Sequence, residues 1–137
     1  MAMNNLDKAL MEFWGGFGVP AFANYAFMHD DIGRRKRPKF PYITYELKRP
    51  AFGKSTIMSA SVWDRQEASP GFRGRTNEIL KCIEQAIPES GVTLKLDGGS
   101  VWISRASNFM EYPKKPDPDD AYIIRAVVGV EVRGFLV

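Results

Sequence analysis

The stretch that decides the fold lies near the end of the chain and reads Tyr122-Ile123-Ile124-Arg125-Ala126-Val127-Val128-Gly129-Val130-Glu131-Val132. Apolar residues occupy every even position from 124 to 132. The odd positions hold charged residues or glycine, with Val127 as the one apolar exception. Successive side chains of a strand point to opposite faces, so this alternation predicts a long strand with one buried face and one polar face. We expect the sheet to form around this strand.

Two hairpins are predicted upstream of that strand. Residues 42–47 and 55–63 alternate between apolar and polar positions, and Pro50 and Gly53 between them mark a turn. Residues 92–96 and 101–104 flank Asp97-Gly98-Gly99, which is a tight-turn signal. Together with the last strand, these segments predict about five strands.

Two amphipathic helices complete the pattern. The first begins near Asn5, an N-cap residue, and ends before Pro20; its apolar face consists of Leu6, Leu10, Phe13 and Phe17. The second opens at Ser69 or Pro70 and stops at Pro88 and Gly91. Its apolar face consists of Phe72, Thr76, Ile79, Leu80, Ile83 and Ile87. Each helix therefore has one side suited to packing on the sheet.

The remaining segments are expected to lack helix and long strands. Residues 20–28 suggest extended chain with at most a short strand, residues 29–40 a charged loop, and residues 112–120 a loop stiffened by prolines. The predicted fold class for residues 1–137 is thus a single α+β domain. It is expected to hold a mainly antiparallel sheet of about four to five strands, with two helices packed on one face.

Composition and charge exclude several classes of protein. No apolar run approaches the roughly 18 residues needed to span a bilayer, and the start of the chain lacks the features of a secretory signal. A single cysteine, Cys82, excludes an internal disulfide and favours a cytoplasmic compartment. The net charge of +3 is local, because Arg34, Arg35, Lys36, Arg37 and Lys39 supply five positive charges within six positions.

Candidate chemical groups are few and scattered. Cys82 has no histidine nearby in the sequence to activate it, so it is interpreted as a small helix residue. His29-Asp30-Asp31 are adjacent residues that rarely converge on one ion, and the acidic run 117–120 lacks the glycine and glutamate of a calcium loop. We therefore expect no metal, no cofactor and no catalytic activity.

The basic cluster at residues 34–39 leaves two readings open. It could contact a nucleic-acid backbone or an acidic protein surface, or it could be a solvated loop. It contains no stacking pair of aromatic residues, which disfavours single-strand binding. Trp63 falls on the hydroxyl-rich face of its predicted strand and is therefore interpreted as an interface residue.

Several ordered segments carry a family resemblance over nearly the whole chain. They are Leu6-Asp7-Lys8-Ala9-Leu10, Phe13-Trp14, Phe17-Gly18, Val19-Pro20-Ala21-Phe22, Phe40-Pro41-Tyr42-Ile43-Thr44-Tyr45-Glu46, Ser59-Ala60-Ser61-Val62-Trp63-Asp64-Arg65, Asp97-Gly98-Gly99-Ser100-Val101-Trp102-Ile103 and the stretch 117–125. In this order and spacing they resemble the small tail terminator (tail-completion, minor capsid) proteins of long-tailed bacteriophages and prophages. The Arg34–Arg37 run departs from the family, whose loop is usually neutral or acidic.

The resemblance implies a structural protein without catalytic residues. Such a protein forms a ring, expected to be a hexamer, on the head-proximal end of the tail tube, stops tube polymerisation and docks the head connector. The implied partners are a second copy of the chain, the tail tube protein and the head-closure or connector protein, with possible passing contact with genomic DNA in the lumen. The implied location is the virion tail or neck, assembled in the bacterial host cytoplasm.

A ring needs two different surfaces on each subunit. The residues expected to supply them lie outside the predicted core: Arg34, Arg35, Lys36, Arg37, Lys39, Trp63, Lys114, Lys115, Asp117 and Asp119. Two other functions remain alternatives: a head-closure or connector adaptor of the neck, and a small nucleic-acid-binding accessory protein. A small enzyme is the least favoured.

Overall fold

The computed structural model of the protein describes residues 6–24, 28–29, 35–36, 39–48, 54–65, 73–116 and 123–136. The helices are α1 (Leu6–Trp14), the short 3-10 helix η2 (Gly15–Phe17) and α2 (Arg73–Ala86). The strands are β1 (Ala21–Ala23), β2 (Met28–His29), β3 (Arg35–Lys36), β4 (Tyr42–Tyr45), β5 (Ser55–Arg65), β6 (Val92–Leu96), β7 (Gly99–Arg105), β8 (Glu111–Pro116) and β9 (Ile123–Leu136). Strands thus outweigh helices in this part of the chain.

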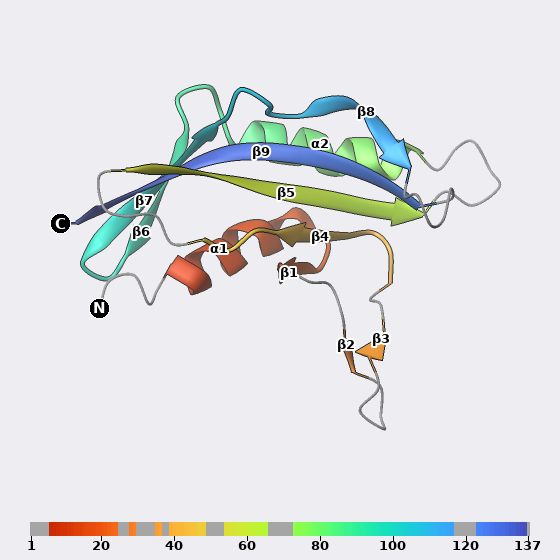
Figure 1. The fold of residues 1–137 in the computed structure, drawn as a ribbon, viewed down its shortest axis with the longest axis horizontal. Coiled ribbons are helices and arrows are strands. Elements are labelled where there is room, and N and C mark those ends of the chain that lie inside the picture. Colours follow the sequence, from red (N-terminus) through yellow and green to blue (C-terminus); the bar gives the residue numbers. More distant parts are fainter. Residues whose placement is uncertain are drawn as a thin grey trace.

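Seven of these strands form one curled sheet around the long strands β5 and β9 (Figure 1). The order along the sheet is β1-β4-β5-β9-β7-β6, and β8 pairs with β9 beyond the end of β7. The pairing of β1 with β4 is parallel, whereas the other pairings in this sheet are antiparallel. β2 and β3 form a separate two-stranded sheet that lies apart from the main one (Figure 1).

The predicted fold class, an α+β domain with four to five strands, is wrong. The structure is dominated by a mixed, curled sheet of more strands, accompanied by two short helices. The difference arises in segments that were assigned to loops. Residues 28–29 and 35–36 pair with each other inside the expected charged loop, and residues 111–116 form β8 where a proline-stiffened loop was expected.

β8 tolerates its prolines because of its place in the sheet. It pairs only with β9, and its register shifts between Glu111 and Lys115, so Pro113 lies in an irregular part of the ladder. Proline cannot donate a backbone hydrogen bond, which confines it to sheet edges and bulges. The prolines of this segment therefore confine the strand to the edge of the ladder but do not prevent it from pairing with β9.

One face of the sheet forms the core. The register of β5 and β9 places Met58 opposite Val130, Ala60 opposite Val128 and Val62 opposite Ala126. These six side chains are all at most 3% exposed. The predicted alternation of both strands is therefore confirmed, as is the antiparallel pairing of residues 42–45 with 60–63.

Both helices contribute to this core. Leu6, Leu10 and Trp14 recur every four residues along α1 and are buried, whereas Phe13 is only partly covered. α1 contacts β1 and β6, the two ends of the strand order, so it bridges the opening of the curled sheet. The predicted first helix is confirmed over Leu6–Trp14, and the glycines that follow it adopt a 3-10 turn.

The second helix is buried through Thr76, Ile79, Leu80, Ile83 and, just past its end, Ile87. It is confirmed over Arg73–Ala86, and its predicted start at Ser69 or Pro70 lies outside the described residues. No helix among the described residues is long and apolar enough to cross a membrane.

Polar contacts fix α2 at both of its ends. The Thr76 hydroxyl, fully buried, donates to Oδ2 of the buried Asp64 of β5 at 3.1 Å. At the other end, Nε of Arg105 donates to the Ile87 carbonyl at 2.7 Å and Nη2 donates to the Glu84 carbonyl at 3.1 Å. The last carbonyls of a helix have no hydrogen-bond partner within the helix. The Arg105 guanidinium from β7 donates hydrogen bonds to carbonyls there, and its positive charge compensates the partial negative charge of this helix end.

Candidate functional site

The face of the sheet opposite the core carries polar and aromatic side chains, and we call it the outer face. The register aligns its members across β4, β5 and β9, because directly paired residues point the same way. Its members on these strands include Tyr42, Thr44, Ser59, Ser61, Trp63, Arg125, Val127, Glu131 and Arg133, extended by Ile57, which is 52% exposed. A partner approaching the sheet from this side would meet these residues.

An aromatic row covers one end of the outer face. The Tyr42 ring stacks on Phe40 at 5.1 Å between centroids and on Trp63 at 6.4 Å. Phe22 of β1 meets the same ring edge-on at 6.2 Å. These contacts bury Tyr42 although it lies opposite the core, so this end of the outer face is a rigid, packed surface.

Arg125 of β9 lies beside that row and is held by two contacts. Its guanidinium carbon is 5.0 Å from the centre of the Trp63 ring, a cation–π geometry. Its Nε donates to the buried Ser61 hydroxyl at 2.9 Å. The Trp63 indole nitrogen in turn donates to the Thr44 hydroxyl at 2.9 Å, which fixes the ring under the guanidinium.

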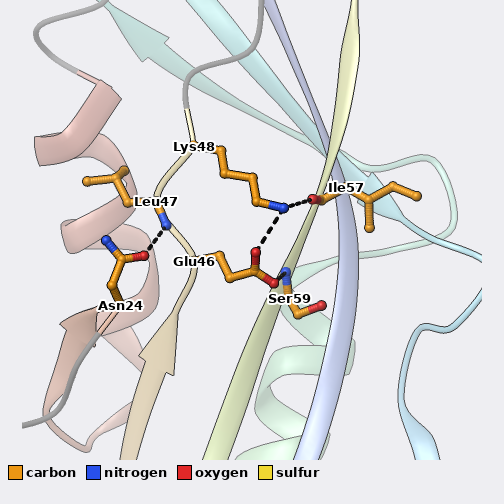
Figure 2. Close-up of polar contacts among 6 residues, drawn as sticks. All are labelled: Asn24, Glu46, Leu47, Lys48, Ile57 and Ser59. Carbon is orange, nitrogen blue, oxygen red and sulfur yellow. Dashed lines mark hydrogen bonds and ion pairs between the residues drawn. The ribbon is translucent and has the colours of Figure 1, made fainter.

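A second polar group joins the chain after β4 to the middle of β5 (Figure 2). Glu46 accepts a hydrogen bond from the Ser59 backbone at 3.2 Å and forms an ion pair with Lys48 at 2.9 Å. Lys48 also donates to the Ile57 carbonyl at 3.3 Å. These contacts prolong the pairing of the two segments beyond the last residue of β4.

Asn24 holds the other side of the same segment. Its Oδ1 accepts from the Leu47 backbone at 3.0 Å (Figure 2), and its own backbone N–H donates to the Tyr45 carbonyl at 2.7 Å. Its φ of 64° lies in the left-handed region, which asparagine tolerates better than most residues. Asn24 thus ends β1 and ties it to the chain after β4.

The ion pair predicts a weak acid sensitivity of folding. The hydrogen bond from Lys48, aided by the Ser59 backbone, lowers the pKa of Glu46 below its ordinary 4.5, against an opposing effect of burial. A lowered folded-state pKa stabilises the fold above the unfolded pKa and loses that contribution as pH falls through the folded value. Since both side chains are about half exposed, we expect at most about 1 kcal/mol.

Urea unfolding of the wild type and of Glu46→Gln at pH 7, 5, 4 and 3 checks this expectation. The difference in the free energy of unfolding between the two proteins should be largest at pH 7 and should shrink below pH 4.5. A difference that stays constant across this range would show that the carboxylate charge of Glu46 contributes nothing. Lys48→Met should remove the same pH-dependent part.

The structure brings together only some of the residues expected at an assembly interface. Trp63 lies on the outer face, directly opposite Arg125 of β9. Lys115 is paired in register with Arg125 from the other side of β9. Arg35 and Lys36 form β3, apart from the main sheet, and Lys39 is exposed. The remaining predicted residues are Lys114, which lies in β8, and Arg34, Arg37, Asp117 and Asp119, which lie outside the described residues.

Sequence reasoning missed Arg125 as a candidate. It was recognised only as an outward position of the last strand, since nothing in the sequence pairs it with Trp63. The link is the register of β5 and β9, in which Trp63 and Arg125 are directly opposite. A charged residue directly opposite an outward tryptophan indicates a cation–π contact, but it can be recognised only once the strand register is known.

The part of the chain that the structure describes contains no candidate metal centre. It contains no group of three or more histidine, cysteine, aspartate or glutamate side chains placed to hold a metal ion. Among the described residues, one open depression lies between α1 and the end of β6, and another lies beside the end of α2. Cys82 is exposed on α2. Neither a scan of protein families nor a search of curated proteins found a match to the chain.

Proposed function

We propose that this protein is a structural assembly protein of a long-tailed bacteriophage or prophage that terminates the tail tube. The observation that carries the proposal is the ordered set of segments, spread over nearly the whole chain, that resembles the tail terminator family. In this role the protein forms a ring, stops tube growth and presents a docking surface to the head connector.

The arrangement of surfaces supports an assembly role. A closed ring requires each subunit to present two different patches. The rigid outer face around Trp63 and Arg125 is one candidate. The separate β2–β3 sheet, within the segment that holds the basic cluster, is a second candidate on another part of the molecule (Figure 1).

Mass measurement and imaging test the ring. Light scattering over a concentration series should give a species of about 93 kDa, six times the 15.5 kDa of one chain, and negative-stain images should show rings. If the protein is a monomer alone, it is mixed with polymerising tail tube protein, and tube lengths are measured with and without it. Tubes that grow to the same length in both cases would refute the terminator function.

Charge reversal then locates the contacts. Arg35→Glu with Arg37→Glu, and separately Lys114→Glu with Lys115→Glu, should abolish capping if these segments form the interfaces. Lys8→Glu with Lys81→Glu is the matched control, because both lysines are exposed helix residues and the change in charge is the same. Capping that survives both test pairs would place the interfaces elsewhere.

The head-closure adaptor and the nucleic-acid accessory protein differ from this proposal in their partners. An adaptor would bind the head connector and leave tube length unchanged. A nucleic-acid-binding protein would retain a short duplex in a salt-dependent way, and neutralising Arg34 to Arg37 would abolish that retention. The tube-length assay separates the proposed function from both.

A further inference from the structure

The geometry points to a carboxylate-binding site on the outer face, formed by the guanidinium of Arg125 and aimed at an acidic side chain of a partner protein. The inference rests on the contacts of Arg125, Trp63 and Ser61 and holds whether or not the protein forms a ring.

Arg125 is oriented before any ligand arrives. The contact of its Nε with Ser61 at 2.9 Å and the Trp63 ring beneath it fix the plane of the guanidinium. Ser61 is only 3% exposed, so the anchor itself is immobile. A side chain that is already ordered loses less conformational entropy on binding, which raises affinity.

The terminal nitrogens of this arginine are available. Arg125 is exposed, and its Nε bond to Ser61 is the one hydrogen bond that its side chain makes to another described residue. Its Nη1 and Nη2 therefore have no acceptor among those residues. Two parallel N–H donors are the geometry that binds a carboxylate in a bidentate manner.

Among the residues whose side chains the structure describes, no carboxylate on the outer face pairs with Arg125. Glu131 is six residues further along β9, which is roughly 20 Å at the rise of a strand, and the buried Asp64 belongs to the core side. On the neighbouring strand the residue paired with Arg125 is another cation, Lys115. An external carboxylate would therefore give Arg125 an ionic partner.

The surroundings favour a protein carboxylate over a nucleic acid. Tyr42 and Arg125 both lie against the Trp63 ring, which leaves it no open face on which a base could stack. Glu46 and Glu131 on the same side of the sheet interrupt the positive charge that a phosphate backbone would need along its length. A single acidic side chain of a partner fits the size and charge of the site.

Titration followed by ¹H–¹⁵N NMR tests the site. The probe is a hexaglutamate peptide, with hexaglutamine as the uncharged control, and the readout is the shift of the Trp63 indole N–H. We expect saturable binding of hexaglutamate, and at least a tenfold loss of affinity in Arg125→Gln. Arg125→Lys should lose nearly as much because it keeps the charge but not the fork of donors.

Arg133→Gln is the matched control, since Arg133 is an exposed arginine on the same strand and the same face. It should change the affinity less than threefold. Equal losses of affinity in Arg125→Gln and Arg133→Gln would mean that only the net charge of the protein matters, and would overturn the site. Absence of binding to hexaglutamate would overturn it as well. Tighter, Arg125-dependent binding of a 16-base-pair duplex would overturn the choice of ligand. None of these outcomes depends on tube capping, so the site and the proposed function fail separately.

Discussion

Leu10→Ala is expected to lower the free energy of unfolding by about 2–5 kcal/mol. Leu10 is 1% exposed and lies in the middle of the buried row of α1, between Leu6 and Trp14. Its removal leaves a cavity beneath the helix that joins the two ends of the sheet, and neighbouring β-structure can only partly collapse into it. For a domain with a total stability of about 5–15 kcal/mol, such a loss is a large fraction.

Chemical denaturation measures this effect, with Met11→Ala as the control. Met11 is the next residue of the same helix but is 53% exposed, so its truncation should cost less than about 0.5 kcal/mol. The midpoint of Leu10→Ala should fall while the slope of unfolding with denaturant stays unchanged. Equal midpoints for the two variants would mean that α1 does not pack on the sheet as described.

Gly91→Ala is expected to cost at least about 3 kcal/mol, as the sum of two separate effects. The φ of Gly91 is 80°, where a side chain is strained. An added Cβ would also meet the Trp102 indole nitrogen and would lie 2.8 Å from the Ile103 carbonyl oxygen. Because that oxygen belongs to a strand paired on both sides, it cannot move aside easily. The indole would lose its 3.1 Å hydrogen bond to the Ser90 carbonyl.

Gly18→Ala isolates the backbone part of this cost. Gly18 has the same φ of 80°, but nothing lies within 4 Å of the position a Cβ would take. It should therefore lose only about 1–2 kcal/mol. If thermal or denaturant unfolding shows the same loss for both variants, the crowding at the start of β6 contributes nothing to the conformation of this turn.

The strongly periodic segments were predictable from sequence. The last strand, both hairpins and the inner faces of both helices follow from spacing alone, since burial imposes a period of two on strands and nearly four on helices. In the first helix, however, one member of the buried row was predicted wrongly. The sequence assigned Phe13 to the buried row, but Trp14 completes it four residues after Leu10, and Phe13 packs edge-on against the indole.

The strands that sequence reasoning missed have a common physical character. β2 and β3 are two residues each, which is too short to show an alternating pattern. β8 contains two prolines, which lack an amide hydrogen, and three residues of weak strand propensity. Each exists because a neighbouring strand offers a ladder to pair with. The parallel pairing of Ala21–Ala23 with β4 arises in the same way.

The site was less accessible to prediction than the fold. Trp63 was identified because it stands among hydroxyl residues on its own strand. Arg125, Ser61 and Thr44 become part of the same group only through cross-strand pairing and diagonal contacts, which depend on residues far apart in the chain. The basic cluster at 34–39 was identified by its charge alone, and its residues Arg35 and Lys36 form β3, outside the main sheet that carries Trp63.

The position of β9 in the strand order has a consequence for biosynthesis. This strand follows every other described strand in the sequence, yet it lies between β5 on one side and β7 and β8 on the other. Until it emerges, the sheet exists as two unconnected halves, each with an open edge and an uncovered apolar face. The core therefore cannot close before β9 has been synthesised, and a variant that lacks Ile123–Leu136 would lack the strand that joins the two halves.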